Sequence, residues 1–171
     1  GKVNVLIGPN GSGKSNFLGF LYTYLGNAVL LKPPVNLLNL SIKENICASD
    51  YEVAQVFNSV VEGVALSKSE FSDGYNTIVA PKEVNISDGQ AFRIALARTI
   101  YAAMTYSNCE YILVDDNLLS VDADMRSRIL DYMKKAHKTF IITDQENREL
   151  YDECNCIHLK QLSQYKPCSD A

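Results

Sequence analysis

Several features are missing from this chain of 171 residues. It has no hydrophobic run long enough to cross a membrane and no signal-peptide pattern, so these residues predict no membrane span of their own. Its 16 basic residues are outnumbered by 20 acidic ones, and the net charge of −4 argues against nucleic acid as a direct partner. It also lacks internal repeats and low-complexity tracts. The length is that expected of one domain with a buried core.

Patterns typical of metal sites and disulfides are also absent. The chain has five cysteines and no C-x-x-C pair: Cys47, Cys109, Cys154, Cys156 and Cys168. Cys154 and Cys156 alternate along an expected strand and would share a face, but no second pair of ligands lies at a suitable spacing for zinc. We therefore predict reduced thiols, as in cytosolic proteins.

The strongest positive feature is a glycine-rich segment between a strand-like run, 3–7, and a helical pattern. It comprises Gly8, Pro9, Asn10, Gly11, Ser12, Gly13, Lys14, Ser15 and Asn16. Residues 8–15 fit G-x-x-x-x-G-K-[ST], and the strand–loop–helix setting favours a phosphate loop over a simple glycine-rich turn. In such a loop the backbone amides and the helix N-terminus surround the phosphates of a nucleotide. We predict that Lys14 bridges these phosphates and that Ser15 ligates Mg²⁺.

A second nucleotide motif follows the apolar run 111–114, which ends in two carboxylates, Asp115 and Asp116. Ligands of α/β proteins bind at the carboxyl ends of buried parallel strands. The pattern therefore predicts that Asp115 holds Mg²⁺ and that Asp116 acts as the catalytic base that orients water. The alternative interpretation is a strand that runs into an acidic turn.

Strand-like and helical patterns alternate along the chain. Strands are expected at 3–7, 28–31, 111–114, 140–143 and 156–159, and helices at 14–25, 50–62, 89–106, 122–136 and 146–152. The alternation predicts an α/β fold, a P-loop NTPase core in which helices flank a mostly parallel sheet. Between its second and third strands we predict an inserted helical subdomain at about 34–105. Because Gly1 leads directly into the first strand, we expect an excised piece of a longer protein.

A third segment resembles a known family. Residues 85–101, N-I-S-D-G-Q-A-F-R-I-A-L-A-R-T-I-Y, are similar to the L-S-G-G-Q signature and following helix of ABC ATPases, and Ser120-Val121-Asp122-Ala123 resembles their D-loop. Residues 40–46 and 76–79 resemble the segments that follow the family's Q-loop and precede its signature. The Asp-Asp ending and the S-V-D-A loop are most similar to the C subfamily, which includes the multidrug-resistance proteins and the cystic fibrosis channel. The resemblance covers nearly the whole chain.

This resemblance implies a single nucleotide-binding domain, 1–171, of an ABC transporter, attached to transmembrane domains on the cytosolic side of a membrane. In the family, two such domains pair head to tail and enclose ATP and Mg²⁺ between one phosphate loop and the partner's signature. The resemblance thus implies contacts to the ATP of a second nucleotide-binding domain from Ser87, Asp88, Gly89 and Gln90. Hydrolysis removes the γ-phosphate contacts and lets the pair open. The loop around 33–41 lies where the family contacts its coupling helices.

Several positions depart from the family's pattern. The Q-loop glutamine aligns with Pro33, and the switch histidine aligns with Asp144, whose carboxylate would repel phosphate. The catalytic glutamate aligns with Asp116, which is one methylene shorter, and the signature's first glycine aligns with Asp88. We therefore expect an ATP hydrolase with a degenerate site, in which Asp116 and Asp144 at the catalytic positions support only slow turnover. The competing interpretation is a shift in register that places Gln145 at the switch.

Two other functions are considered. DNA-maintenance ATPases of the structural-maintenance-of-chromosomes group have a similar phosphate loop, but they place a long coiled coil before the signature. Ser15 and Ser87 are only 72 positions apart here, with no heptad run between them. The second alternative is a non-catalytic interaction module in which ATP gates assembly. Transmembrane helices in the parent chain would favour the transporter.

Overall fold

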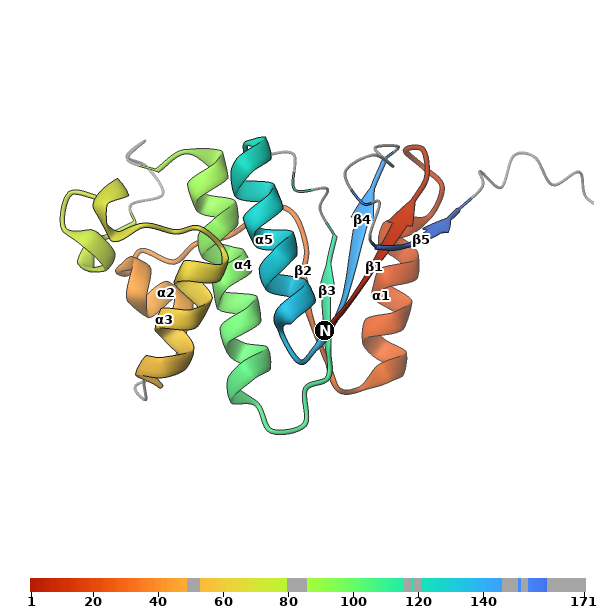
Figure 1. Ribbon diagram of the computed structural model, residues 1–171, viewed down its shortest axis with the longest axis horizontal. Coiled ribbons are helices and arrows are strands. Elements are labelled where there is room, and N and C mark those ends of the chain that lie inside the picture. Colours follow the sequence, from red (N-terminus) through yellow and green to blue (C-terminus); the bar gives the residue numbers. More distant parts are fainter. Residues whose placement is uncertain are drawn as a thin grey trace, which may run out of the picture.

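The computed structural model describes residues 1–48, 53–79, 86–115, 118, 121–145, 151 and 154–159. These residues form an α/β fold with one parallel sheet (Figure 1). Its strands are β1 (Lys2–Ile7), β2 (Ala28–Leu31), β3 (Tyr111–Val114), β4 (Thr139–Asp144) and β5 (Asn155–His158). They lie side by side in the order β2-β3-β4-β1-β5. The predicted parallel sheet is confirmed, and each predicted strand is correct to within one residue at either end.

Helices occupy most of the remaining described chain. They are α1 (Lys14–Leu25), α2 (Ile42–Cys47), α3 (Ala54–Gly63), α4 (Asp88–Thr105) and α5 (Ala123–Lys135), with short 3-10 helices η1 (Lys68–Glu70) and η2 (Gly74–Asn76). The predictions for α1, α4 and α5 are confirmed to within one residue. The predicted helix at 50–62 begins at Ala54 in the described residues, and that at 146–152 lies outside them except for Tyr151. The sequence prediction missed α2, although Ser41 and Glu44 form the capping box that marks its start.

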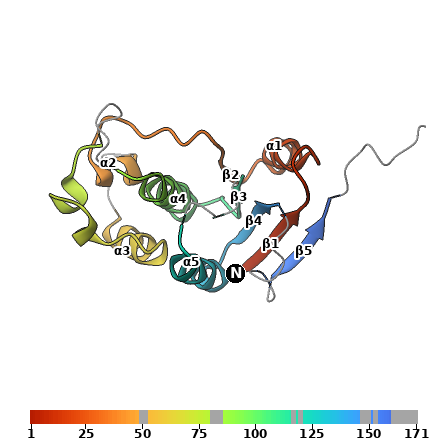
Figure 2. The same ribbon diagram turned by 90° about the horizontal axis from the view of Figure 1, so that it is seen from above.

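Alternation along the strands gives the two faces of the sheet different cores. On one face, Leu6 and Leu113 pack with Leu18 of α1. The opposite face carries the residues that alternate with them, and these belong to the larger core shared with α4 and α5: Val3, Val5, Ile7, Ile112, Val114, Phe140 and Ile142. Figure 2 shows α1 and α5 on opposite sides of the sheet. The period-2 pattern thus explains a sheet that is covered on both faces.

The helices between β2 and β3 gather beyond the β2 edge of the sheet (Figure 2). α4 is their centre, because it contacts α2 and α3 on one side and β2 and β3 on the other. This arrangement is the helical insertion that the sequence predicted, and its boundaries at 34 and 105 stay a prediction.

A polar clasp holds the irregular segment between β2 and α2 against α4. Asn45, only 1% exposed, donates from Nδ2 to the carbonyls of Leu38 (2.9 Å) and Leu40 (3.2 Å). Its Oδ1 accepts from the Leu38 amide at 2.8 Å. Arg98 of α4 donates to the Asn45 carbonyl at 2.7 Å and to the Asn36 carbonyl at 3.1 Å. Residues without regular structure are therefore fixed by side chains from two helices.

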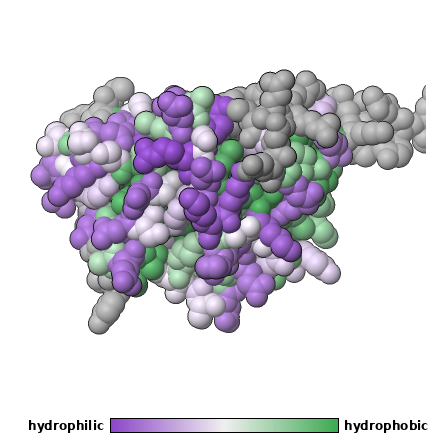
Figure 3. Space-filling model, viewed as in Figure 1, coloured by the Kyte–Doolittle hydropathy of each residue, from purple (hydrophilic) through white to green (hydrophobic). Residues whose placement is uncertain are grey.

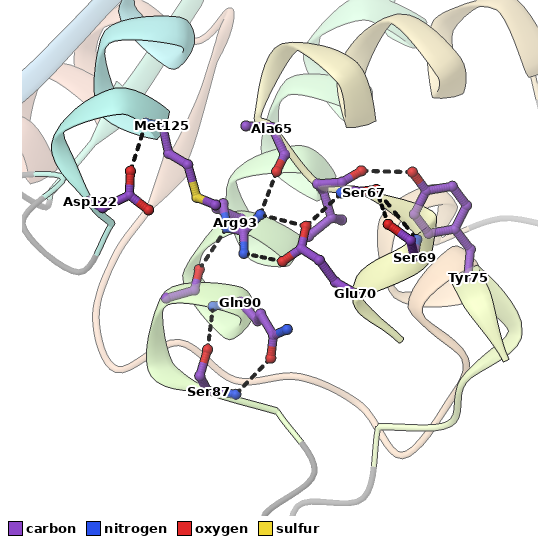
Figure 4. A network of polar contacts seen from close by, with 12 residues as sticks. Ala65, Ser67, Ser69, Glu70, Tyr75, Ser87, Gln90, Arg93, Asp122 and Met125 are labelled. Carbon is purple, nitrogen blue, oxygen red and sulfur yellow. Dashed lines mark hydrogen bonds and ion pairs between the residues drawn. The ribbon is translucent and has the colours of Figure 1, made fainter. Parts of the chain in front are cut away.

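A second network ties the start of α4 to η1 (Figure 4). The Arg93 side chain is 5% exposed and makes an ion pair with Glu70, with 2.5 Å between Nη2 and Oε2. Arg93 also donates to the carbonyls of Ala65 and Gly89. Burial opposes ionisation of Glu70, but hydrogen bonds from Arg93 and from the Ser67 amide outweigh it and lower the pKa of the carboxyl. The first turns of α4 are thus anchored through a charged pair.

Candidate functional site

An open cavity of about 430 Å³ lies at the carboxyl edge of the sheet. The loop between β1 and α1 lines it with Asn10, Gly11, Gly13, Lys14, Ser15 and Asn16. The other lining residues lie at or just beyond the ends of β2, β3 and β4: Pro33, Asp115, Thr143, Asp144 and Gln145. This edge is where parallel α/β sheets bind ligands. The fold therefore gathers segments from four parts of the chain around one space.

The loop backbone is shaped for close approach by a ligand. Gly13, which caps α1, has φ 91°, a left-handed conformation that glycine adopts without steric cost. A Cβ on Gly8 would lie 2.7 Å from the Ser12 Oγ, which is too close for any larger residue. Side chains cap the N-termini of α2, α4 and α5, but no side chain caps α1. Its first amides are therefore open to an anion in the cavity.

The Lys14 side chain reaches back to the start of this loop. Its Nζ donates to the carbonyls of Gly8 at 2.5 Å and Pro9 at 2.9 Å. Within the described part of the chain, no carboxylate pairs with it. The ammonium is thus held at the cavity wall by neutral carbonyls and keeps its positive charge free for a ligand.

Two hydroxyls converge on the Asp115 carboxylate. The Ser15 hydroxyl donates to Oδ1 at 3.0 Å, and the Thr143 hydroxyl donates to the same oxygen at 3.3 Å. Carboxylate and hydroxyl oxygens suit Mg²⁺, which commonly uses one or two protein oxygens together with substrate phosphates and water. No group of three or more His, Cys, Asp or Glu residues forms a closed metal site in the described ranges. The donor set therefore fits a Mg²⁺ ion that is shared with a phosphate ligand.

Asp144 lies at the end of β4 and is 1% exposed. Its Oδ1 accepts from the Gln145 amide at 2.5 Å, whereas Oδ2 has no hydrogen-bond partner among the described residues. Burial, and then the neighbouring Asp144 carboxylate, raise the pKa of the Tyr151 phenol. A carboxylate in this position opposes a phosphate rather than donating to it. The other predicted catalytic residue, Asp116, lies outside the described residues.

Two further positions at which the sequence differs from the family pattern also line this cavity. Pro33 forms part of its wall and offers no side-chain donor or acceptor. Gln145, the alternative switch residue, is exposed and also lines the cavity. Asp144 and Gln145, the two candidates for the position of the switch histidine, therefore both lie at this site.

The predicted signature residues do not line the cavity. Ser87, Asp88, Gly89 and Gln90 begin α4, on the same edge of the molecule as the loop before α1 (Figure 1). The Ser87 Oγ accepts from the Gln90 amide at 3.2 Å, and the Gln90 Oε1 accepts from the Ser87 amide at 2.9 Å. Asp88 is exposed in the first turn, where its charge complements the helix dipole. The N-terminus of α4 is therefore capped by its own side chains.

Sequence reasoning missed one residue of this site and one contact elsewhere in the fold. Thr143 lies beside Asp144 at the end of β4, and the rule that parallel strands deliver ligands at their carboxyl ends could have identified it. The clasp between Asn45 and Arg98 joins residues 53 positions apart and had no sequence signal.

Among the described helices, none is both long and apolar enough to span a membrane.

No protein-family model matches the chain. It is 31% identical over 150 residues to the ABC transporter gloK of Glarea lozoyensis, covering 80% of this chain and 11% of the relative. It is 32% identical over 160 residues to the ATP-dependent bile acid permease of Saccharomyces cerevisiae, covering 77% and 9%. The metal resistance protein YCF1 of the same yeast is 30% identical over 146 residues, covering 78% and 9%. The chain thus spans about a tenth of the length of these curated relatives.

A solved structure has the same fold. It is that of a bacterial Atm1-family ABC exporter with ATP bound, and the match has a TM-score of 0.77 at 22% identity over 92% of this chain and 32% of the exporter chain. The parallel sheet and its flanking helices therefore match an exporter fold.

Proposed function

This chain belongs to the ABC transporter family, with relatives mostly of the C-subfamily type, and we propose that it is the ATP-binding domain of such a transporter. The observation that carries the proposal is the convergence of Lys14, Ser15 and Asp115 on one cavity beside the N-terminus of α1, which no side chain caps. In this proposal, residues 1–171 form one domain of a longer protein, with a helical subdomain at about 34–105.

The cavity supplies groups for each part of Mg-ATP that it would hold. The α1 amides and Lys14 bind the β- and γ-phosphates, because helix N-termini and ammonium groups favour anions. Ser15 and Asp115 hold Mg²⁺, which neutralises phosphate charge when it is bound. Thr143 donates to the same Asp115 oxygen and keeps that carboxylate turned toward Ser15.

The same cavity favours retention of ATP over rapid hydrolysis. Pro33 offers no side-chain group that could orient water, and the Asp144 carboxylate offers no hydrogen-bond donor to a γ-phosphate during hydrolysis. The proposed domain therefore works mainly as a nucleotide-gated clamp with slow turnover. Its nucleotide cycle would be coupled to movement of transmembrane domains.

The test compares two radioactive labels on ATP in membranes that contain the whole protein. Photoreactive ATP carrying the label on the α- or the γ-phosphate is bound, washed and cross-linked after increasing delays. We expect both labels to persist equally, because nucleotide held at the Lys14 site stays intact. Prompt loss of the γ-label alone would overturn the slow-turnover proposal. Retention of neither label in a properly folded protein would overturn ATP binding itself.

A second nucleotide-binding domain is the proposed partner at the edge that carries Asp88. Replacing Asp88 with glycine is expected to tighten ATP-dependent pairing of the chain by about tenfold, since it removes a negative charge that would face the partner's phosphates. Sedimentation velocity at low salt with a non-hydrolysable ATP analogue measures the pairing. Asp88→Asn removes the charge but keeps the size, and Asp124→Ala is the control because Asp124 lies in the first turn of a different helix, α5. Pairing that Asp88→Gly leaves unchanged would mean that Asp88 faces away from the nucleotide.

We propose that the exposed segment after β2, residues 33–41, contacts the transmembrane domains. The domain would then lie at the cytosolic side of a membrane. Two side chains of this segment, Leu38 (56% exposed) and Leu40, are apolar. Leu40 lies near the exposed Ile78, because its carbonyl accepts from the amide of the following residue, Val79, at 2.9 Å. Exposed apolar side chains that gather in this way are typical of protein contacts.

α1 supports the proposal that other parts of a longer protein cover this domain. Its outer face exposes Phe17, Phe20 and Tyr24, and the rings of Phe20 and Tyr24 stack 5.7 Å apart, while Tyr22 is exposed on another side of the helix. Figure 3 shows the opposite side of the molecule, where hydrophobic and hydrophilic side chains are mixed. An aromatic helix face of this kind favours burial against further protein.

A further inference from the structure

A second cavity, of about 570 Å³, lies far from the proposed nucleotide site. It is bounded by α3, the end of α4, and the end of α5 with the two residues that follow it. These helix ends lie at the edge of the molecule opposite to the loop between β1 and α1 (Figure 1). His137 lines this cavity two residues before β4, and Asp144, the last residue of β4, lines the other, so the length of the strand separates them by about 20 Å.

The inner walls of this cavity are apolar. Val56 and Val60 of α3, Met104 of α4 and Ala136 form them. Tyr132 closes one side, and its ring is packed against the Gly63 backbone so closely that a Cβ on Gly63 would lie 2.4 Å from it. The volume is within the range of about 300–1,000 Å³ typical of small-molecule sites. The walls therefore suit an apolar body of modest size.

Among the described residues that line the cavity, one side chain carries a formal charge. Lys135 is exposed at its rim and has no ion-pair partner among the described residues. The His137 imidazole, the Ser59 hydroxyl and the Gln55 amide add hydrogen-bonding groups, and no described carboxylate lines the space. Burial raises the pKa of the Tyr132 phenol, although Ser59 partly opposes this, so the phenol adds no negative charge. The ammonium of Lys135 and the hydrogen-bonding groups beside it can therefore pair with an anionic group at the rim of the cavity.

We propose that this cavity binds a small amphipathic organic anion, with its apolar body between α3 and α5 and its carboxylate or sulfonate at Lys135 and His137. The ligand would be chemically unlike ATP, because the described walls offer no glycine-rich phosphate loop and no set of oxygens for Mg²⁺. Binding there would bridge α3 and α4 of the helical insertion to α5, which packs on the sheet. The proposal is independent of the nucleotide site.

The test uses octanoate as the probe and octylammonium as its partner of opposite charge with the same alkyl body. Both are titrated into the 171-residue chain, and the methyl resonance of Met104 is followed by NMR, with Met125 as an internal reference. We expect a saturable shift of Met104 with octanoate and little or none with octylammonium. Equal responses to the two probes would overturn the proposed charge selectivity.

Variants separate the two halves of the proposed site. Lys135→Glu is expected to weaken octanoate binding by about tenfold, because it replaces an attraction by a repulsion. Val56→Trp is expected to abolish it by filling the space between the helices. Lys32→Glu makes the same change of charge just beyond β2, at the opposite edge of the sheet, and should leave binding unchanged. Octanoate binding that survives both Lys135→Glu and Val56→Trp would overturn the site.

Discussion

Replacing Lys14 with alanine is expected to weaken ATP binding by about 100-fold, because charge-assisted hydrogen bonds contribute about 1.5–3 kcal/mol each and Lys14 would make more than one to the phosphates. The ammonium already lies at the cavity, held by the Gly8 and Pro9 carbonyls. Without it, the cavity keeps the α1 amides but loses the one ammonium among its described lining residues. Fluorescence titration with a labelled ATP analogue measures the affinity directly.

Two controls make this result specific. Lys32→Ala removes another exposed lysine near the same edge of the sheet, but that lysine does not line the cavity, so affinity should be unchanged. Thermal unfolding of Lys14→Ala without nucleotide checks that the loop stays folded when the two carbonyls lose their donor. Unchanged ATP affinity in a folded Lys14→Ala chain would refute the proposed site.

The second large effect is expected on stability. Replacing Glu70 with alanine should reduce the free energy of unfolding by about 3 kcal/mol, because breaking a buried ion pair leaves one charge without compensation. Arg93, only 5% exposed, would keep the Ala65 and Gly89 carbonyls as its partners. We place the effect at the low end for buried pairs because the Glu70 side chain is 23% exposed. Chemical denaturation measures the loss.

A nearby carboxylate provides the matched control for Glu70. Asp73 precedes η2 but makes no capping bond through its side chain, so Asp73→Ala should change the unfolding free energy by less than about 0.5 kcal/mol. A loss in Glu70→Ala as small as that of the control would contradict the proposed role of the ion pair.

The pH dependence tests the same pair in another way. The pKa of Glu70 is lowered from its ordinary value of 4.5, so its stabilising effect is complete above that value and is lost as the pH falls through the folded-state pKa. The difference in stability between the wild type and Glu70→Gln should therefore shrink as acid is added below about pH 4.5. A difference that is independent of pH in this range would mean that the Glu70 charge is not what stabilises the fold.

The local pattern of residues was enough to predict the parallel sheet, the loop at 8–15 and the long helix α4. The spacing of glycines and of apolar residues acts over a few positions, and neighbouring residues decide whether a strand, turn or helix forms. The same reasoning missed α2, because a six-residue helix is too short to show a clear period. Its capping box was the only local sign.

Contacts between distant residues depended on the tertiary structure. Only the folded chain brings Pro33, Asp115 and Asp144 to the same cavity as Lys14, and only the packing of three helices brings Lys135 and Met104 to one cavity. The polar partners of Asn45 and Arg93 were equally hidden, since burial and hydrogen bonding depend on which elements pack together. The sequence by itself determined which segments carry phosphate-binding and metal-binding groups, because those motifs are local. The tertiary structure decided which of those groups meet, because a cavity exists only between elements that have packed.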